Sequence, residues 1–449
     1  MTIRLCLCIK SFQEGKDMNK QTKDILVVGF ALFAMFFGAG NLIFPPYMGF
    51  LSGSVWTAAL LGFLITGIGL PLMGIIASAR AGGTVEHLAG RVGHRFARVL
   101  SVVILLAIGP LLAIPRTAAT TFEMGVRPNI PWATPAISAL VFFAITLYFA
   151  LNQSTVVDKI AKILTPFLLA TLVTIIFKGI FSPLAAPTTG SLANPFTAAF
   201  KEGYQTMDAM ASIVFAEIII AALIFKGYKK VKDQVKMASF AGLIAALGLG
   251  FVYGGLMYLG ATSRSLFAEG IERTSLLIGI ADGILGSSGK VALGLAVSLA
   301  CLTTSAGLTA TVADYFSHIS KGKLKYKPIC IATVVFSGVF ATVGVNKIVQ
   351  IAVPLLVMVY PVAIILIVFT IIRKKALPRS VYTGAIIGAL ATSVFEALTA
   401  AGLPITFANN LISYIPLADA GFPWIIPALI GTAVGAAAAF RRQKFSQIS

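Results

Sequence analysis

The run Phe33-Ala34-Met35-Phe36-Phe37-Gly38-Ala39-Gly40-Asn41-Leu42-Ile43-Phe44-Pro45-Pro46 interrupts an apolar segment that extends from residue 25 to about residue 51. The segment is long enough to cross a bilayer, because a helix needs about 20 mostly apolar residues to do so. Each glycine weakens a helix by roughly 1 kcal/mol relative to alanine. Two glycines beside an asparagine, with two prolines closing the run, therefore predict local unwinding inside the span.

Such unwinding is costly in a membrane. Unpaired backbone groups in hydrocarbon cost several kcal/mol each, so a broken helix persists only where it lines a cavity or a binding site. Small residues also let helices pack closely, and packing explains most glycines in membrane spans. Packing does not require Asn41, however, so the run favours a discontinuous span whose freed backbone groups bind a solute and an ion.

The composition is that of a polytopic membrane protein. Of the 449 residues, 58% are hydrophobic and 11% are charged, whereas about a quarter of the residues in a soluble domain are charged. The net charge of +19 comes from short basic clusters between apolar runs, and no nucleic-acid-binding motif accompanies them. The four cysteines and three histidines do not have the spacing of a metal site. We therefore expect neither a nucleic-acid partner, nor a cofactor, nor an enzymatic activity.

The apolar runs predict an all-α protein with twelve transmembrane helices. They lie at residues 24–50, 55–79, 96–120, 133–151, 160–181, 200–225, 236–261, 290–316, 328–344, 348–372, 381–401 and 422–440. Residues 1–17 lack a signal-peptide pattern, and we interpret them as a dispensable leader or an overlong start before Met18. The polar stretch 262–289 is expected to form helices at the membrane surface.

The lysines and arginines predict the orientation. If residues 1–23 form a cytoplasmic tail, most of the 35 basic residues fall in cytoplasmic segments. The positive-inside rule then places both the N-terminal tail and the C-terminal tail, residues 441–449, in the cytoplasm. We expect the protein in the cell membrane, which is the plasma or inner membrane.

A second interruption lies five spans after the first. The sixth predicted span contains Tyr204-Gln205-Thr206-Met207-Asp208-Ala209-Met210-Ala211-Ser212, again polar and small residues inside an apolar run. An odd number of spans per repeat gives the two repeats opposite topology, and paired interruptions are typical of transporter binding sites. We therefore predict inverted repeats at residues 24–181 and 200–372, with the two spans in 381–440 at the periphery.

These interruptions predict a site for a zwitterionic amino acid. The half-helix that resumes at Asn41 offers free N–H groups and a positive dipole end to a carboxylate. Freed carbonyls of residues 34–37 and 208–211 would accept from the ammonium group. Methionine and phenylalanine are more often core than pocket, but here they would form an adaptable apolar lining. The predicted solute-binding set is Met35, Phe36, Gly38, Ala39, Gly40, Asn41, Met207, Asp208, Ala209, Met210, Ala211 and Phe215.

A hydroxyl cluster in the eighth span predicts a cation site. Threonine and serine in membrane helices commonly donate to carbonyls one turn earlier, and that is one interpretation of Thr303-Thr304-Ser305. The other is a site for a hard cation, since hydroxyl and carbonyl oxygens suit sodium. The predicted sodium ligands are Ala34, Phe37, Ala300, Thr303 and Thr304.

Ionisable residues inside spans are functional candidates because burying them is costly. Asp208 lies in the second interruption and is the strongest. Glu217 is two turns deeper in the same span. Arg116 and Glu123 are seven residues apart near the outer end of the third span, where they would pair as a gate or as a structural ion pair.

At these residues the chain resembles the branched-chain amino acid:cation symporter family (LIVCS), from residue 18 to the C-terminus. The resemblance is carried by residues 36–46, by Ala113-Ile114-Pro115-Arg116-Thr117-Ala118, by Gly203-Tyr204-Gln205-Thr206-Met207-Asp208 and by the hydroxyl cluster. The family belongs to the amino acid–polyamine–organocation superfamily. Membership implies a LeuT-type fold of five plus five inverted spans, with residues 205–214 unwound in the sixth. It also implies uptake of leucine, isoleucine and valine coupled to sodium or protons.

The leading hypothesis is a symporter that imports branched-chain amino acids by alternating access, with sodium as the coupling ion. Proton coupling is the alternative, although Lys159 and Lys162 lie too near the start of the fifth span to replace the ion. A passive channel would need a continuous polar pathway, and the sequence has only local polarity. A membrane scaffold or sensor would tolerate valine at Gly38 and Gly40.

Overall fold

The computed structural model describes residues 20–152, 155–372 and 377–446, and all regular elements in these ranges are helical. The leader prediction for residues 1–17 lies outside them. The described helices are α2 (Lys20–Phe36), α3 (Ala39–Ser52), α4 (Trp56–Leu64), α5 (Leu70–Ala81), α6 (Val85–Ala89), α7 (His94–Leu106), α8 (Ala113–Thr121), α9 (Pro135–Asn152), α10 (Thr155–Phe181), α11 (Pro195–Glu202), α12 (Asp208–Phe225), α13 (Val231–Thr262), α14 (Arg273–Ile319), α15 (Tyr326–Ala341), α16 (Val345–Ile372), α17 (Arg379–Ala400), α18 (Thr406–Ser413) and α19 (Ile425–Ser446).

Seven helices of the described ranges are long and apolar enough to cross a membrane, or eight when the bent pair α2–α3 counts as one span. Four shorter apolar helices accompany them: Pro135–Leu151, Pro166–Phe181, Tyr326–Ala341 and Ile425–Arg441. Helices dominate because a helix pairs its backbone groups within itself, which lipid cannot do for them. The structure thus confirms an all-helical membrane protein, whereas the prediction of twelve spans is met by seven to eight in the described ranges.

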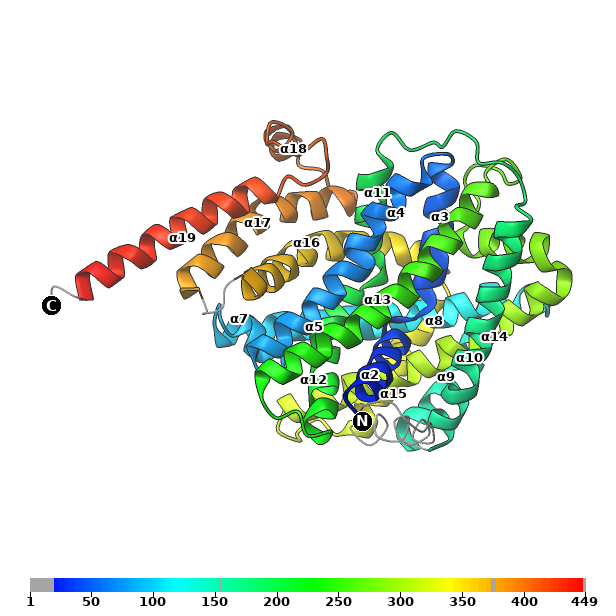
Figure 1. The fold of residues 1–449 in the computed structure, drawn as a ribbon, viewed down its shortest axis with the longest axis horizontal. Helices are drawn as coiled ribbons and strands as arrows, with labels where there is room; N and C mark the ends of the chain where they lie inside the picture. The colour runs from blue at the N-terminus through cyan, green and yellow to red at the C-terminus, as the bar shows by residue number, and fades with distance from the viewer. Residues whose placement is uncertain (1–19, 153–154, 373–376, 447–449) are drawn as a thin grey trace.

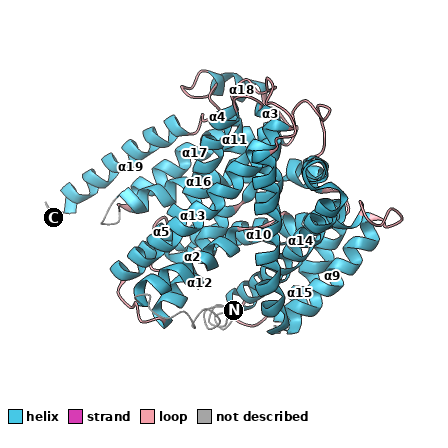
Figure 2. Ribbon diagram, turned by 45° about the vertical axis from the view of Figure 1, so that its right-hand side comes forward, coloured by secondary structure: helices cyan, strands magenta, loops and turns pink. Residues whose placement is uncertain are grey.

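Helices from both halves of the chain form one packed body. Helix α13 packs against α2 and α3, α12 against α5, and α16 against α5 and α17. Helix α19 contacts α17 and projects away from the rest, toward the C-terminus (Figure 1). The same arrangement is visible after a 45° turn (Figure 2).

Close backbone approaches fix the contact between α3 and α13. A Cβ atom on Gly49 would lie 1.8 Å from the carbonyl oxygen of Met257, and one on Gly260 would lie 1.9 Å from that of Pro46. Pro45 and Pro46 lie inside α3. Prolines are tolerated within membrane helices because neighbouring groups pair with the carbonyls that they free.

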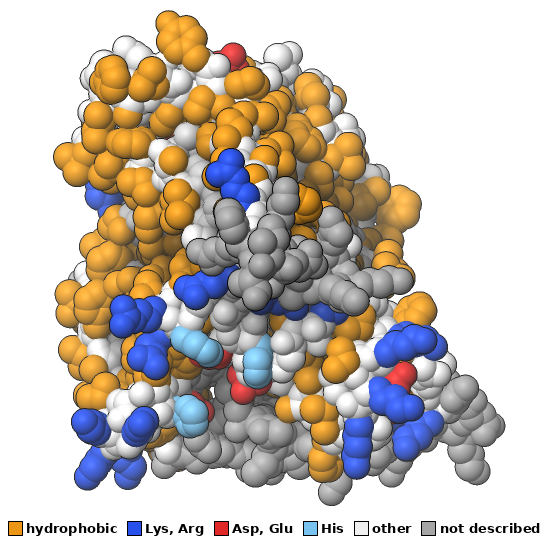
Figure 3. Space-filling model, turned by 90° about the vertical axis from the view of Figure 1, so that its left-hand side faces the viewer, with side chains coloured by type: hydrophobic (Ala, Val, Ile, Leu, Met, Phe, Trp, Pro, Cys, Tyr) orange, Lys and Arg blue, Asp and Glu red, His pale blue; other side chains and the backbone are white. Residues whose placement is uncertain are grey.

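The charged side chains are unevenly distributed. On the face shown in Figure 3, most lysines and arginines lie in the lower part and hydrophobic side chains cover the upper part. At the end of the molecule where α2 begins, the Lys226 ammonium pairs with the Asp24 carboxylate, and the Tyr228 hydroxyl donates to the same carboxylate at 3.0 Å. Burial, followed by the hydrogen bond to Asp24 and its charge, raises the pKa of Tyr228 to about 12. The phenol therefore stays a donor at neutral pH and ties the α12–α13 connection to α2.

Candidate functional site

The first interruption is a break in the helix, as predicted. Helices α2 and α3 meet at an angle of 72°, separated by Phe37 and Gly38. Gly38 is extended, with φ −127° and ψ −176°, and its N–H lies 3.4 Å from the Asn41 side-chain oxygen. The first N–H groups of a helix have no partner within it. The break therefore directs the free N–H groups of the first turn of α3, which includes Gly40, into the interior of the protein.

The second interruption is shorter than expected. Helix α11 ends at Glu202, a 3₁₀ turn covers Gly203–Thr206, and Met207 adopts φ +62° before α12 begins at Asp208. The expected unwinding through Ala209, Met210 and Ala211 to residue 214 is therefore wrong, and the carbonyls of 208–211 belong to a helix. An acidic residue is stabilised in the first turn of a helix by the positive dipole end, and the residues after Asp208 are good helix formers.

The two interruptions meet through a buried polar network. The Asn41 side-chain amide donates to the Asp208 carboxylate at 2.6 Å and also to the Tyr253 hydroxyl of α13. The Asp208 backbone N–H donates to the Thr206 hydroxyl at 3.3 Å. Asn41, Asp208 and Tyr253 are each at most 5% exposed. Both predicted polar site residues thus lie where α3 and α12 begin, and Tyr253 is a third member that the sequence did not reveal.

Arg116 lies between the two breaks. It is 5% exposed, and its guanidinium donates to the Gln205 carbonyl of the second break at 2.6 Å. The guanidinium carbon lies 5.3 Å from the centre of the Phe44 ring. A Cβ atom on Gly40 would lie 2.8 Å from a terminal nitrogen of Arg116. No carboxylate of the described residues lies within 4.0 Å of this guanidinium, so a buried cation faces the first turn of α3.

The predicted pairing of Arg116 with Glu123 is wrong. Seven residues separate them by about 10 Å along a helix, and each has a nearer partner. The Glu123 carboxylate accepts from the Thr274 hydroxyl at 2.6 Å and from the Val345 backbone N–H at 2.8 Å. Glu123 therefore links the third span to the beginnings of α14 and α16. Glu217 is exposed on α12, about 13 Å along the helix from Asp208, so the structure does not bring it to the network.

Apolar side chains surround the junction of the two breaks. The rings of Phe36 and Phe215 lie 6.0 Å apart, so α2 and α12 contact each other here. Phe36, Met207 and Met210 are buried, and Met35 and Phe215 are half-buried. Ala39, Ala209 and Ala211 are buried as well. These side chains form an apolar surface beside the polar network.

The hydroxyl cluster lies within α14. The Thr303 hydroxyl donates to the Ala300 carbonyl at 2.9 Å, which is the bond one turn back that such residues commonly make. Thr303 and Thr304 are half-buried. Ala34 and Phe37 lie at the first break, and the assignment of these five residues to a sodium site stays a prediction. The side chains of Lys159 and Lys162 are not among those that the structure describes.

A further ionic cluster, which the sequence analysis missed, surrounds Arg273, whose guanidinium lies near the same Phe44 ring as Arg116. The Arg273 guanidinium donates to the Glu202 carboxylate at 3.0 Å and to the Asn346 side-chain oxygen at 3.2 Å. It also lies 4.3 Å from the centre of the Tyr47 ring and 5.9 Å from that of Phe44. The Phe44 ring thus lies near the guanidinium groups of both Arg116 and Arg273. The cluster joins the end of α11 to the beginnings of α14 and α16. The sequence signal for this cluster was Arg273 itself, an arginine directly after a polar loop.

Comparison with known proteins agrees with this architecture. The family model described as "Branched-chain amino acid transport protein" matches residues 21–441. The branched-chain amino acid permease BraB of Bacillus subtilis is 40% identical over 423 residues, covering 92% of this chain and 95% of the relative. The branched-chain amino acid transport system 2 carrier protein of Pseudomonas aeruginosa is 36% identical, covering 91% and 94%.

Two solved structures of one transporter share the fold. Mhp1 in an inward-facing conformation superposes with a TM-score of 0.58 at 15% identity, covering 88% of this chain and 92% of that one. Mhp1, a nucleobase-cation-symport-1 family transporter, in a closed conformation with bromovinylhydantoin, gives a TM-score of 0.58 at 17% identity, covering 91% and 96%. At these identities the likeness concerns the fold alone, and the fold is LeuT-like.

Proposed function

This chain belongs to the branched-chain amino acid transport protein family, and we propose that it is a secondary active symporter that imports leucine, isoleucine and valine together with sodium. It is a multi-pass membrane protein and a transporter, not an enzyme. The observation that carries the proposal is the meeting of two broken spans at one buried polar network. Backbone interruptions at membrane depth are tolerated where they line a binding site.

The carboxylate of the solute binds between Arg116 and the first turn of α3. The guanidinium has five N–H donors and one acceptor, the Gln205 carbonyl, among the described residues. It approaches α3 closely because Gly40 has no side chain. An arginine and a helix N-terminus are both suited to a carboxylate. This role for Arg116 replaces the gating role expected from the sequence.

The ammonium of the solute binds at Asp208, whose carboxylate already accepts from Asn41 at 2.6 Å. A buried carboxylate beside a buried guanidinium presents opposite charges to the two ends of a zwitterion. The aliphatic side chain packs on Phe36, Phe215 and the neighbouring methionines, which have no charge to attract a cationic or anionic side chain.

Sodium binds to the carbonyls of Ala34, Phe37 and Ala300 and to the hydroxyls of Thr303 and Thr304. The Thr303 hydroxyl uses its hydrogen in the bond to Ala300, which leaves its lone pairs available to a cation. Since Ala34 is in the last turn of α2 and Phe37 is in the break that also contacts the solute, ion binding and solute binding order the same segment. Shared ordering of this kind couples the two binding events.

The transport cycle is alternating access about this site. Twelve spans, formed by inverted repeats at 24–181 and 200–372 and two peripheral spans, place both termini in the cytoplasm. Spans 1, 2, 6 and 7 rock against a scaffold of spans 3, 4, 5, 8, 9 and 10. The Arg273–Glu202 pair at 3.0 Å closes the outer side, and the Asp24–Lys226 pair holds spans 1 and 6 together on the inner side.

Uptake of radiolabelled leucine into proteoliposomes tests the proposal. We expect accumulation above equilibrium with an inward sodium gradient, competition by isoleucine and valine, and no accumulation with equal sodium on both sides. Accumulation driven by a proton gradient without sodium would support the alternative of proton coupling, for which Asp208 is the candidate carrier. Uptake that only equilibrates would refute symport in favour of a facilitator.

A further inference from the structure

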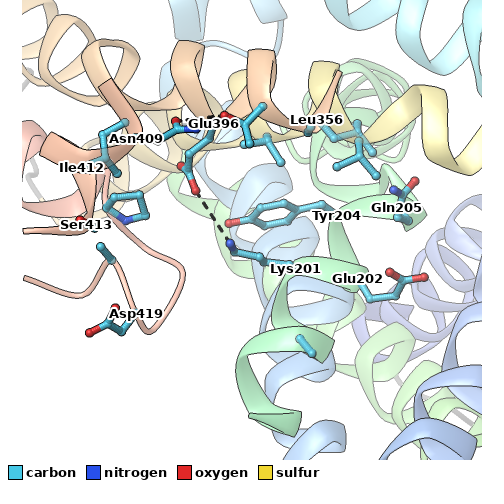
Figure 4. A pocket seen from close by; sticks show the side chains of 17 residues that line it. Lys201, Glu202, Tyr204, Gln205, Leu356, Glu396, Asn409, Ile412, Ser413 and Asp419 are labelled. Atoms are coloured by element: carbon cyan, nitrogen blue, oxygen red, sulfur yellow. Dashed lines mark hydrogen bonds and ion pairs between the residues drawn. The ribbon is translucent and has the colours of Figure 1, made fainter. Parts of the chain in front are cut away.

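A cavity of about 490 Å³ lies outside the network described above, between the transport core and the peripheral helices. Helix α11 and the 3₁₀ turn after it form one wall, α16 forms the second, and α17, α18 and the loop before α19 form the third. Figure 4 shows side chains from all three walls directed toward a common space. The cavity lies at the end of the molecule where α18 is found (Figure 1).

Opposite charges face each other in this cavity without close contact. The Lys201 ammonium lies 3.8 Å from the Glu396 carboxylate, too far for a strong hydrogen bond, and their side chains are 40% and 20% exposed. The Glu202 carboxylate is held by Arg273 at 3.0 Å. Asp419 contributes a further, exposed carboxylate on the loop before α19. The lining therefore offers one ammonium and two carboxylates to a ligand.

Two buried polar atoms of the lining have no hydrogen-bond partner among the described residues. Tyr204 is 5% exposed, its ring stacks on Tyr360 with centroids 4.0 Å apart, and its hydroxyl has no partner. In Figure 4 this hydroxyl points toward the Lys201–Glu396 pair. The side-chain oxygen of Gln205, which is 3% exposed, has no partner either. Buried polar groups are nearly always paired, so the Tyr204 hydroxyl, which is directed into the cavity, indicates a ligand.

We propose that this cavity is a second binding site, outside the transport core, for an amino-acid zwitterion with an apolar side chain. Lys201 and the Tyr204 hydroxyl donate to the carboxylate, and Glu396 accepts from the ammonium, with Asp419 at the rim. Val353, Leu356 and Val357 of α16 provide the apolar wall. The choice of ligand class rests on the proposed function, whereas the existence of the site rests on the cavity and its unpaired atoms.

Occupancy of this site acts on the hinge of the core. Tyr204 and Gln205 belong to the 3₁₀ turn that breaks the sixth span, and the Gln205 carbonyl is the acceptor for Arg116 at 2.6 Å. A ligand that holds Tyr204 against α16 and α17 holds this turn in place. We expect it to slow the release of solute from the core site.

Equilibrium binding of radiolabelled leucine to the purified full-length protein, with sodium, tests the proposal. We expect two leucine molecules per wild-type chain and one for Glu396→Gln, with excess unlabelled leucine slowing dissociation from the core in the wild type only. Lys201→Gln should act as Glu396→Gln does, and it is a second, half-exposed position should the first variant not fold. Asp208→Asn should also bind one molecule, at the second site.

The matched control is Asp282→Asn, which breaks the Lys290–Asp282 pair of 3.7 Å on α14. It should bind two molecules. One leucine per wild-type chain, unchanged in Glu396→Gln and Lys201→Gln and lost in Asp208→Asn, would overturn the second site and leave the proposed function intact. No leucine binding to the folded wild type would instead overturn the proposed function.

Discussion

Two glycines of the same half-helix should respond to alanine in opposite ways. At Gly40, the added Cβ atom would lie 2.8 Å from a terminal nitrogen of Arg116. That nitrogen is at the end of a flexible side chain, so the guanidinium moves and the fold is kept. At Gly49, the added atom would lie 1.8 Å from the backbone carbonyl oxygen of Met257. Neither backbone can yield there without separating α3 from α13.

The magnitudes follow from what each substitution removes. The terminal nitrogen of Arg116 that meets the added atom is not the one that donates to the Gln205 carbonyl at 2.6 Å, so that bond is kept while the displaced nitrogen is withdrawn from the solute carboxylate. A hydrogen bond that involves a charged group contributes about 1.5–3 kcal/mol. Gly40→Ala should therefore weaken leucine binding by about 10- to 150-fold, at 1.4 kcal/mol for each factor of ten. Gly49→Ala should destabilise the protein by about 1–3 kcal/mol, the usual cost of overpacking.

Leucine binding and thermal unfolding in detergent separate the two effects. Gly40→Ala should keep the wild-type unfolding temperature and lose affinity, whereas Gly49→Ala should unfold earlier. The control is Gly254→Ala on α13, where the added atom would lie 3.6 Å from Leu60 in ordinary contact. It should change neither property. A Gly40→Ala protein that binds leucine with wild-type affinity would refute the placement of the carboxylate at Arg116.

Three further substitutions test other parts of the site. Thr303→Ala should weaken sodium activation of leucine uptake by about 1–3 kcal/mol, seen as a higher half-saturating sodium concentration, with leucine binding at saturating sodium preserved; unchanged activation would remove Thr303 from the ion site. Asp208→Asn should abolish leucine accumulation while the protein remains folded, because the ammonium loses its counter-charge; full uptake would contradict that assignment. Glu202→Gln should weaken the contact of 3.0 Å with Arg273. A cysteine placed at Phe44 should then react faster with an external thiol reagent. Equal labelling of this cysteine with Glu202 and with Gln at position 202 would exclude a gate at this pair.

Much of the first break could be predicted from local chemistry. Gly38, Gly40 and Asn41 weaken a helix wherever they occur. In a membrane, a weakened helix is tolerated only where it lines a cavity or a binding site. The extent of the second break was less accessible. Asp208 was interpreted as part of an unwound segment, yet an acidic residue followed by helix formers is equally a helix start. The distinction depends on Met207, whose φ of +62° is set by tertiary contacts and not by its own preference.

The partners of the charged residues could not be predicted, because long-range contacts choose among several candidates. Glu123 is seven residues from Arg116 in the sequence, but it accepts from Thr274 and Val345, which are 151 and 222 residues away. Tyr253 gave no signal because one tyrosine in a glycine-rich span is unremarkable. Only its position against Asn41 shows that α13 contributes to the site.

The placement of Arg116 bears on whether the site binds a zwitterion or a neutral solute. A buried guanidinium with one carbonyl acceptor has much of its hydration uncompensated, and burying a charge without a partner is strongly unfavourable. A guanidinium that is buried between two helix breaks therefore requires an anion as its partner. Asp208 compensates in part, but its carboxylate is engaged by Asn41 and lies more than 4.0 Å from the guanidinium. A solute carboxylate pairs with Arg116, and the ammonium of the same solute pairs with Asp208. The broken spans provide the backbone groups that neither side chain supplies. The pairing of one buried guanidinium with one buried carboxylate in this site therefore favours a zwitterion over a solute without charged groups.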